Sequence, residues 1–412
     1  MTKSNMDIRN KVKEQLQSKS IVIVGTNIAA QRFYRNNKDK CRIKICLSSY
    51  SGHREFLLEE EKDFLVYNFY DYVADEDDYF VIFEDRYAWL ENQLLAEGKV
   101  LFDNFVQGYM AEIAMSSKKV ALIAGNCQMG MIYYFLKEIS AFTNEYHLFW
   151  FPTHRYKSRW SLRSVALLRN MCDLYICMNH DKKDYKFFTS EELPTACKVL
   201  TVPYIQMRLL WPQMNMDEGN FFIKNSRTEE HGPFEFADAN INAMINKDMS
   251  VEEIIQKLSD DTFYDEKFVS EWAENVLHNL EMADAGCDIK LAPYVRENYR
   301  KVSLYRDGFH MQPWLVCELL HRLLKILNIE DDELVRIEEQ KADNDVYKRF
   351  LIHCTEVPIY PSVAKALGLE WIDKDTRYDV TFYNGIRKVT FEEYIREYYN
   401  ICSMMKTIQE EW

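Results

Sequence analysis

The sequence predicts an α/β protein in which an N-terminal Rossmann-like domain with a parallel sheet precedes an α/β domain with a large helical portion. Short β-branched runs alternate with helical patterns over residues 20–105, and the same alternation starts again at residue 120. Helical patterns dominate from residue 234 to about 350. We therefore expect two domains, 1–117 and 118–412.

The first domain is expected to contain five strands joined by helices. The strands are expected at 20–25, 42–49, 63–69, 79–85 and 99–105. Helical spacing follows at 26–37, and a second helix at 86–98 ends near Gly98. Strands that alternate with helices favour parallel pairing with right-handed crossovers.

The second domain is expected to begin as another α/β unit and to end in a hairpin and a helix. Strands are expected at 120–125, 173–179 and 198–205, and helices at 129–139, 249–258 and 313–327. Pro313 suits the first turn of the last of these helices. The segment 378–391 is typical of a hairpin, with Asn384-Gly385 as its two-residue turn.

Composition excludes several classes of protein. The chain has 412 residues, 47% apolar and 28% charged, which is typical of a globular protein. The net charge of −14 disfavours a general nucleic-acid binder. The ten cysteines form no CxxC motif and the N-terminal segment lacks an apolar signal core, which predicts reduced thiols and a cytoplasmic protein. The longest uncharged stretch, 120–136, is too short and too polar to predict a membrane span.

The turn after the first strand lies where a dinucleotide-binding motif would lie. Such a motif has glycine at its first, third and sixth positions, and here Gly25, Asn27 and Ala30 occupy them. Asn27 adds a side chain where a pyrophosphate must approach the backbone. We therefore favour a scaffold without a cofactor, and keep a nucleotide or nucleotide-sugar site as the alternative.

A second turn, Gly125-Asn126-Cys127-Gln128, places a thiol on the first turn of a helix at the carboxyl end of a strand. Ligands bind at that edge of open α/β sheets, and a helix N-terminus stabilises a thiolate. The backbone N–H groups, helped by the amides of Asn126 or Gln128, could hold a developing oxyanion. The alternative is a buried cysteine that only fills space.

From this motif onward the sequence resembles the WcbI-like polysaccharide-biosynthesis acyltransferases. GNCQ after an apolar strand matches the opening motif of that family, and four later segments follow in the family's order over about residues 118–400. These segments are 172–181, 199–213, 298–327 and 357–399. The family usually places histidine directly before proline, whereas Met311-Gln312 here separate His310 from Pro313.

The resemblance implies that the protein binds coenzyme A or acetyl-coenzyme A. It also implies transfer of an acyl group, acetyl by preference, to a sugar hydroxyl of a capsular or other surface polysaccharide or its precursor. Gly125 and Gln128 would then contact coenzyme A beside Cys127.

Acid–base chemistry near Cys127 needs a group that titrates near neutral pH, and histidine is suited to this. His310 is the best candidate because it precedes a helix in the matched segment. Asp307, three residues earlier, could orient it as in the Asp-x-x-His of SGNH-type esterases. Alternatively, His310 is a loop residue that only caps the helix. Asn179 and His180 end a strand of the same sheet and are predicted to contact the cofactor. Asn179 could donate to an oxyanion and His180 is an alternative base, or else the two form a polar strand end.

A basic stretch lies between Glu145 and Asp173, which contains no acidic residue. Its five cations are Arg155, Lys157, Arg159, Arg163 and Arg169. The first four are predicted to bind the phosphates of coenzyme A. A solvated helix face, a nucleotide-sugar site and an anionic membrane surface are the alternatives.

The prediction is thus a cytoplasmic, coenzyme A-dependent O-acyltransferase whose partners are acyl-coenzyme A and a saccharide acceptor. Cys127 either becomes acylated or only shapes the oxyanion site while His310 acts as the base. An SGNH-like esterase or thioesterase and a non-catalytic binding protein are the competing functions. The spacing of histidine and cysteine predicts no metal. A peripheral membrane contact and a homo-oligomer stay open.

Overall fold

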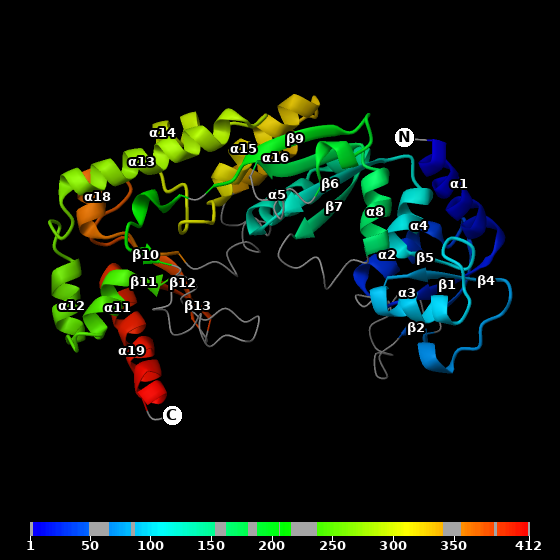
Figure 1. Cartoon of the computed structure of the whole chain (residues 1–412), viewed down its shortest axis with the longest axis horizontal. Coiled ribbons are helices and arrows are strands. Elements are labelled where there is room, and N and C mark those ends of the chain that lie inside the picture. Colours follow the sequence, from blue (N-terminus) through cyan, green and yellow to red (C-terminus); the bar gives the residue numbers. More distant parts are fainter. Residues whose placement is uncertain are drawn as a thin grey trace. The chain divides into compact units, whose positions relative to one another are not determined.

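The structure is a computed structural model of the chain. It describes residues 3–48, 66–83, 87–152, 162–179, 188–205, 207–215, 237–340, 356–382 and 385–410. The chain divides into two compact units (Figure 1). The first unit is formed by residues 1–126, 143–176 and 186–199, and the second by residues 127–142, 177–185 and 200–412.

Five parallel strands form the N-terminal sheet, in the order β3-β2-β1-β4-β5. They are β1 (Ser20–Val24), β2 (Arg42–Ser48), β3 (Val66–Asn68), β4 (Asp78–Ile82) and β5 (Phe105–Gln107). The helices of this part are α1 (Lys3–Ser18), α2 (Ile28–Asn37), α3 (Tyr87–Ala96) and α4 (Gly108–Ala114), with the 3-10 turn η1 (Phe69–Asp71). β4 is buried along its whole length, as expected for an inner strand covered on both faces. The predicted Rossmann-like parallel sheet is confirmed.

The prediction of a strand at 99–105 is wrong, because β5 begins only at Phe105. Phe102 has a positive φ of 69°, and its N–H donates to the Phe105 carbonyl at 2.9 Å. The Asn104 side chain accepts a hydrogen bond from the Val100 N–H at 2.9 Å. These contacts close a turn, and Val100 is 52% exposed. The apolar residues before Asp103 therefore belong to the loop that leads into β5 and not to the sheet.

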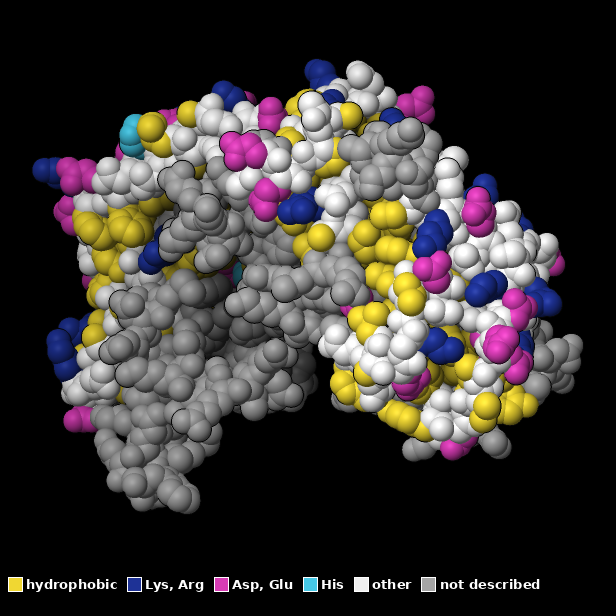
Figure 2. All heavy atoms as spheres, turned by 45° about the vertical axis from the view of Figure 1, so that its right-hand side comes forward, with side chains coloured by type: hydrophobic (Ala, Val, Ile, Leu, Met, Phe, Trp, Pro, Cys, Tyr) yellow, Lys and Arg dark blue, Asp and Glu magenta, His cyan; other side chains and the backbone are white. Residues whose placement is uncertain are grey.

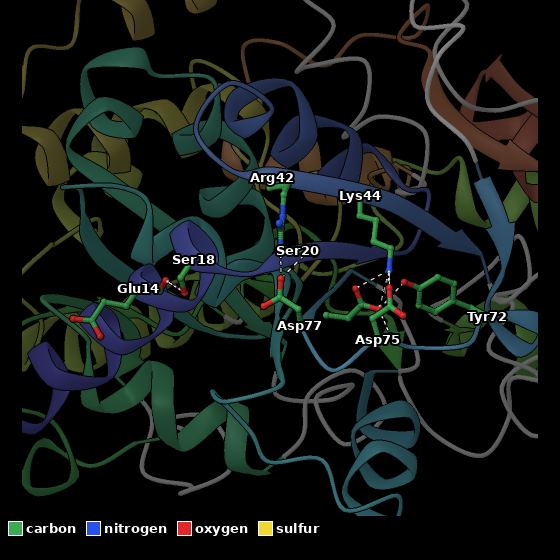
Figure 3. A network of polar contacts seen from close by, with 9 residues as sticks. Glu14, Ser18, Ser20, Arg42, Lys44, Tyr72, Asp75 and Asp77 are labelled. Atoms are coloured by element: carbon green, nitrogen blue, oxygen red, sulfur yellow. Dashed lines mark hydrogen bonds and ion pairs between the residues drawn. The ribbon is translucent and has the colours of Figure 1, made fainter.

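Polar side chains join the starts of β1, β2 and β4 (Figure 3). The buried Asp78 carboxylate accepts hydrogen bonds from Lys44 Nζ at 3.0 Å, the Tyr72 hydroxyl at 2.6 Å and the Asp75 N–H at 2.7 Å. Burial raises the pKa of Asp78, but these hydrogen bonds outweigh burial, so the net shift is downward. Arg42 pairs with Asp77 beside this cluster. A buried carboxylate is tolerated here because it is paired and fully hydrogen-bonded.

The surface of the first unit mixes charged and hydrophobic side chains (Figure 2). Exposed ion pairs include Arg32–Glu112 and Lys11–Asp103, each at 2.7 Å. Exposed ion pairs of this kind contribute about 0–1 kcal/mol each, so the stability of the unit comes mainly from its buried strands.

A second sheet has the order β7-β6-β8-β9. Its strands are β6 (Lys119–Gly125), β7 (Tyr146–Pro152), β8 (Leu174–Asn179) and β9 (Lys198–Pro203), with α8 (Leu162–Asn170) between β7 and β8 and η2 (Ser190–Glu192) before β9. Strands β6, β8 and β9 confirm the three predicted strands. β7 pairs in parallel with β6 and was not predicted, although its aromatic residues favour a strand.

Helices make up most of the second unit. They are α5 (Cys127–Lys137), α6 (Ser140–Glu145, which continues into the first unit), α11 (Ala239–Ile245), α12 (Val251–Leu258), α13 (Glu266–Ala285), α14 (Ala292–Asn298), α15 (Pro313–Leu327), α16 (Asp332–Gln340), α18 (Pro361–Leu367) and α19 (Phe391–Glu410). Short elements between them are η3 (Arg208–Leu210), β10 (Met214–Asn215) and β11 (Ala237–Asp238). α15 has the predicted bounds, with Pro313 as its first residue. Ser250 and Glu253 form a capping box at the start of α12.

The predicted C-terminal hairpin is present as β12 (Tyr378–Phe382) and β13 (Gly385–Val389). The register pairs Phe382 with Gly385. Gly385 is therefore the first residue of β13, and the prediction that it belongs to the two-residue turn is wrong.

Candidate active site

The strand-to-helix turn at Cys127 forms as predicted. β6 is buried from Val120 to Gly125, and α5 begins at Cys127. Gly125 has a φ of +151°, a backbone conformation that residues with a side chain rarely adopt. The thiol is half-buried. Cys127 therefore occupies the first turn of a helix, where backbone N–H groups have no partner within the helix.

The other half of the site is a closed loop from Tyr305 to Met311, which we call the histidine loop. Tyr305 and Met311 form an antiparallel bridge, and the Arg306 N–H donates to the His310 carbonyl at 2.9 Å. Inside the loop, one Asp307 oxygen accepts from the N–H groups of Phe309 at 2.7 Å and His310 at 2.9 Å. Asp307 thus fixes the backbone that carries the imidazole.

The loop brings Asp307, His310 and Cys127 into one chain of contacts. The second oxygen of Asp307 lies 2.7 Å from His310 Nδ1. The His310 ring is also hydrogen-bonded to the Cys127 thiol. Because the carboxylate already engages Nδ1, the thiol contact falls to Nε2. This is the order of groups in a nucleophile–histidine–acid triad.

Burial and charge act against each other on His310. The imidazole is 7% exposed and Asp307 is 2% exposed. Burial alone lowers the pKa of His310, but the charge and hydrogen bond of Asp307 and the contact with Cys127 together raise it well above its ordinary value. Asp307 and Cys127 together therefore favour the imidazolium form of His310 at neutral pH.

Gln128 connects the cysteine turn to the histidine loop. Its Nε2 donates to the Ile205 carbonyl at 2.6 Å and to the Phe309 carbonyl at 2.7 Å. Gln128 follows Cys127 and Phe309 precedes His310, so this buried amide fixes the residues next to both reacting side chains. Both amide hydrogens are engaged, which leaves neither for the coenzyme A contact predicted from the sequence.

Gly308 allows the histidine loop to pack closely against residues 207–214. The Met207 N–H donates to the Gly308 carbonyl at 2.8 Å. A Cβ atom at Gly308 would lie 2.8 Å from the side chains of Arg208 and Met214. Only glycine fits here without a shift of these neighbours, so the loop's position depends on this residue.

Asn179, at the end of β8, contacts the end of α13. Its Nδ2 donates to the Ala283 carbonyl at 3.4 Å, and a Cβ at Gly286 would lie 2.8 Å from that nitrogen. His180 and the cations Arg155, Lys157 and Arg159 lie outside the described residues. Arg163 lies in α8, and only its backbone is described. The structure therefore brings together Cys127, Asp307 and His310, with Gly125 and Asn126 in the turn.

In the dinucleotide-like turn after β1, the side chain of Asn27 occupies the hydrogen-bonding groups that a ligand would need. Asn27 is the N-cap of α2, where its side-chain oxygen accepts from the Ala30 N–H at 3.0 Å. Its amide nitrogen donates to the Phe83 carbonyl. The N–H that would meet a pyrophosphate is thus capped internally. This arrangement suits a scaffold without a bound dinucleotide.

Sequence reasoning missed the bridging role of Gln128 and the contribution of Ile205. The available signal was Pro203, the last residue of β9, because a proline at the end of a strand turns the chain away from the sheet, here toward Ile205. Gln128 donates to two backbone carbonyls, and the pattern of side chains in the sequence does not predict where backbone carbonyls lie.

Among the described residues, no group of three or more His, Cys, Asp or Glu side chains is placed to hold a metal ion. Within the same part of the chain, every helix is too short or too polar to cross a membrane.

Comparison with known proteins agrees with the resemblance noted in the sequence. No curated protein matches the chain. A solved structure described as WcbI, a novel polysaccharide biosynthesis enzyme, matches with a TM-score of 0.51 and 16% identity, over 70% of this chain and 91% of the other. It is described as native protein without a disulfide bond between coenzyme A and a cysteine. This similarity shows a common fold. The sequence profile of the family "Polysaccharide biosynthesis enzyme WcbI" matches residues 120–332, more than half of the chain. The chain therefore belongs to the WcbI family of polysaccharide biosynthesis enzymes.

Proposed function

We propose that this protein is a coenzyme A-dependent O-acyltransferase that transfers an acyl group, acetyl by preference, to a sugar hydroxyl of a surface polysaccharide or its precursor. The observation that carries the proposal is the contact chain from Asp307 through His310 to Cys127 at a helix N-terminus. Family membership supports a role in polysaccharide biosynthesis. The solved relative's description, which names coenzyme A and a cysteine together, supports the donor.

In the first step, the Cys127 thiol has given its proton to His310, and the resulting thiolate attacks the thioester carbonyl of acyl-coenzyme A. The developing oxyanion is stabilised by N–H groups of the first turn of α5, with Asn126 beside them. The C–S bond to coenzyme A breaks, and the leaving thiolate takes the proton of the His310 imidazolium. The products are acyl-Cys127, free coenzyme A and neutral His310.

In the second step, neutral His310 accepts the proton of a sugar hydroxyl, whose oxygen attacks the acyl-Cys127 carbonyl. The Cys127 thiolate leaves and is again paired with an imidazolium. Asp307 keeps Nδ1 protonated in both states, so Nε2 carries the moving proton.

The donor's phosphates need cations, and the proposal assigns them to Arg155, Lys157, Arg159 and Arg163. These residues give the acid-free stretch its charge in a chain of net −14. Gly125, Asn179 and His180 are proposed to line the donor site. For Gln128 we propose a positioning role instead, because its amide hydrogens face two backbone carbonyls.

The second candidate function is a thioesterase, and the Asp307–His310 geometry favours it equally because water can replace the sugar. Intact-mass analysis after mixing with acetyl-coenzyme A tests both. We expect one acetyl group on wild-type protein and none on Cys127→Ala, with Cys177→Ser as the control that still accepts it. Release of free acetate at the same rate with and without saccharide acceptors would identify a thioesterase. Binding of coenzyme A without any turnover would contradict both and leave a binding protein.

A further inference from the structure

Two cysteines outside the candidate active site meet where two neighbouring strands begin. Cys172 lies two residues before β8, and Cys197 lies directly before β9. The Lys198 N–H donates to the Asp173 carbonyl at 2.9 Å, which fixes the residues that follow the two cysteines side by side. The thiols of Cys172 and Cys197 lie close enough for each to shift the pKa of the other, while their sulfurs also lie 3.1 Å from the Leu174 carbonyl and 3.7 Å from the Lys198 carbonyl. The proposed acyl transfer uses neither of them.

The spacing at this place suits a disulfide. Neighbouring strands lie about 4.8 Å apart, and disulfides join Cα atoms that are roughly 4.4–6.8 Å apart. Each thiol influences the pKa of the other, so the two side chains are close, and forming the bond requires them to leave the carbonyls that they now contact.

The two thiols differ in access and acidity. Cys172 is 2% exposed, and its sulfur lies 3.1 Å from the Leu174 carbonyl. Cys197 is half-buried and therefore within reach of a small reagent. Burial also raises the pKa of Cys172, which disfavours its thiolate. Cys197 is thus the attacking sulfur, and Cys172 is the one that resolves.

We propose that Cys172 and Cys197 form a thiol–disulfide site that low-molecular-weight disulfides oxidise. The Cys197 thiolate attacks one sulfur of the small disulfide, forms a mixed disulfide and releases one small thiolate. Cys172 then gives up its proton, attacks the Cys197 sulfur and releases the second small thiolate. The protein loses two electrons and two protons, and the small disulfide is reduced to two thiols.

The site lies at the end of the sheet opposite the Cys127 turn. Asp173, next to Cys172, accepts from the Val120 N–H at 2.9 Å, and its own N–H donates to the Val120 carbonyl at 2.9 Å. Val120 is at the start of β6, whereas Gly125 is at its end. Oxidation should therefore link β8 to β9 and leave the Cys127 thiol free.

Equilibration of the full chain in mixtures of reduced and oxidised glutathione tests the proposal. Free thiols are then blocked with N-ethylmaleimide, and tryptic peptides are mapped by mass spectrometry. We expect a cross-link between the peptides 170–182 and 187–198 through Cys172 and Cys197, with Cys127 still blocked by the reagent. Fragmentation distinguishes Cys172 from Cys177, which lies in the same peptide.

Three variants sharpen the result. Cys197→Ser should abolish the cross-link, and Cys172→Ser should leave glutathione attached to Cys197. Cys177→Ser, which removes another buried thiol of β8, should keep the cross-link. The proposal is overturned if no mixture that leaves the chain folded forms the cross-link. Persistent glutathionylation of Cys197 in the wild type, or pairing of Cys197 with a different cysteine, would overturn it as well.

Discussion

The imidazole of His310 illustrates how a buried base is kept charged. Burial opposes the imidazolium, while the Asp307 carboxylate at 2.7 Å and the Cys127 thiol favour it. An imidazolium beside a thiol stabilises the negative sulfur, so the charge on His310 should set the nucleophilicity of Cys127.

The variant Asp307→Asn tests this charge. It removes the main cause that raises the pKa of His310, so the imidazole should become neutral at a lower pH. Alkylation of Cys127 by iodoacetamide at neutral pH should slow about tenfold, with a smaller loss in mildly acidic solution, where the imidazolium persists. Cys197, which does not contact His310, is the internal control. An unchanged pH profile for Cys127 would mean that Asp307 does not control its reactivity.

Gln128 is a positioning residue in the proposed mechanism. In Gln128→Ala two carbonyls lose their donor, which should cost about 1–3 kcal/mol of stability. Because Cys127 and His310 flank this contact, kcat should also fall about 10- to 100-fold while KM for acetyl-coenzyme A changes little. Steady-state kinetics of acyl transfer measures both constants.

Gln312 offers the matched control for that experiment. It is also a buried amide beside the histidine loop, but its Nε2 donates to Glu356 at 2.8 Å and not to the cysteine turn. Gln312→Ala should lose comparable stability and keep most of its kcat. Equal losses of kcat in the two variants would show that Gln128 acts only through stability.

At the scale of elements, His321 attaches α16 to α15. Its ring lies 2.6 Å from Asp331 and 2.8 Å from Glu338. These carboxylates, with the Glu338 hydrogen bond as the largest cause, raise the pKa of His321 from 6.5 to about 9. A raised pKa means that the stabilisation is complete below pH 6.5 and is lost as the pH rises through about 9.

His321→Ala should therefore destabilise the protein below pH 6.5 by about 1–2 kcal/mol, a value reduced because the partners are partly exposed. The difference from wild type should shrink above about pH 9. Urea unfolding at several pH values measures it. Arg322→Ala is the control, because Arg322 pairs with Glu318 on its own helix and with the Lys290 carbonyl, and not with α16. If the loss of stability in His321→Ala is the same at every pH, the side chain stabilises the protein through packing and not through its charge.

Elements with a strong pattern were predictable, and elements defined by contacts were not. The buried run 120–125 and the apolar face of residues 313–327 identify β6 and α15 from the letters alone. β7 is rich in aromatic residues, which suit a strand and a buried helix alike, and only its pairing with β6 identifies it. The apolar residues before β5 lie in a turn. In the site, Cys127, His310 and Asp307 follow from residue chemistry and the family resemblance. The amide of Gln128 acts through backbone carbonyls, whose position depends on the folded chain.

At the scale of the whole molecule, the net charge opposes the proposed donor. A chain of −14 repels a ligand that carries several phosphate charges, so binding must depend on the acid-free stretch between Glu145 and Asp173. Attraction between exposed charges is screened over a Debye length of about 8–10 Å at physiological ionic strength. Both the repulsion and the local attraction should therefore be visible in the salt dependence of binding.

Calorimetric titration with coenzyme A tests this balance. Arg155→Gln and Arg159→Gln should each weaken binding about five- to tenfold at low salt, since a lost charge-assisted contact costs about 1–1.5 kcal/mol. The penalty should shrink as salt screens the remaining cations. Arg32→Gln removes an equal charge from the first unit, where Arg32 pairs with Glu112, and should change the affinity little. If all three variants weaken binding equally, only the net charge matters. If none does, the phosphates are bound elsewhere and the basic stretch is a solvated surface.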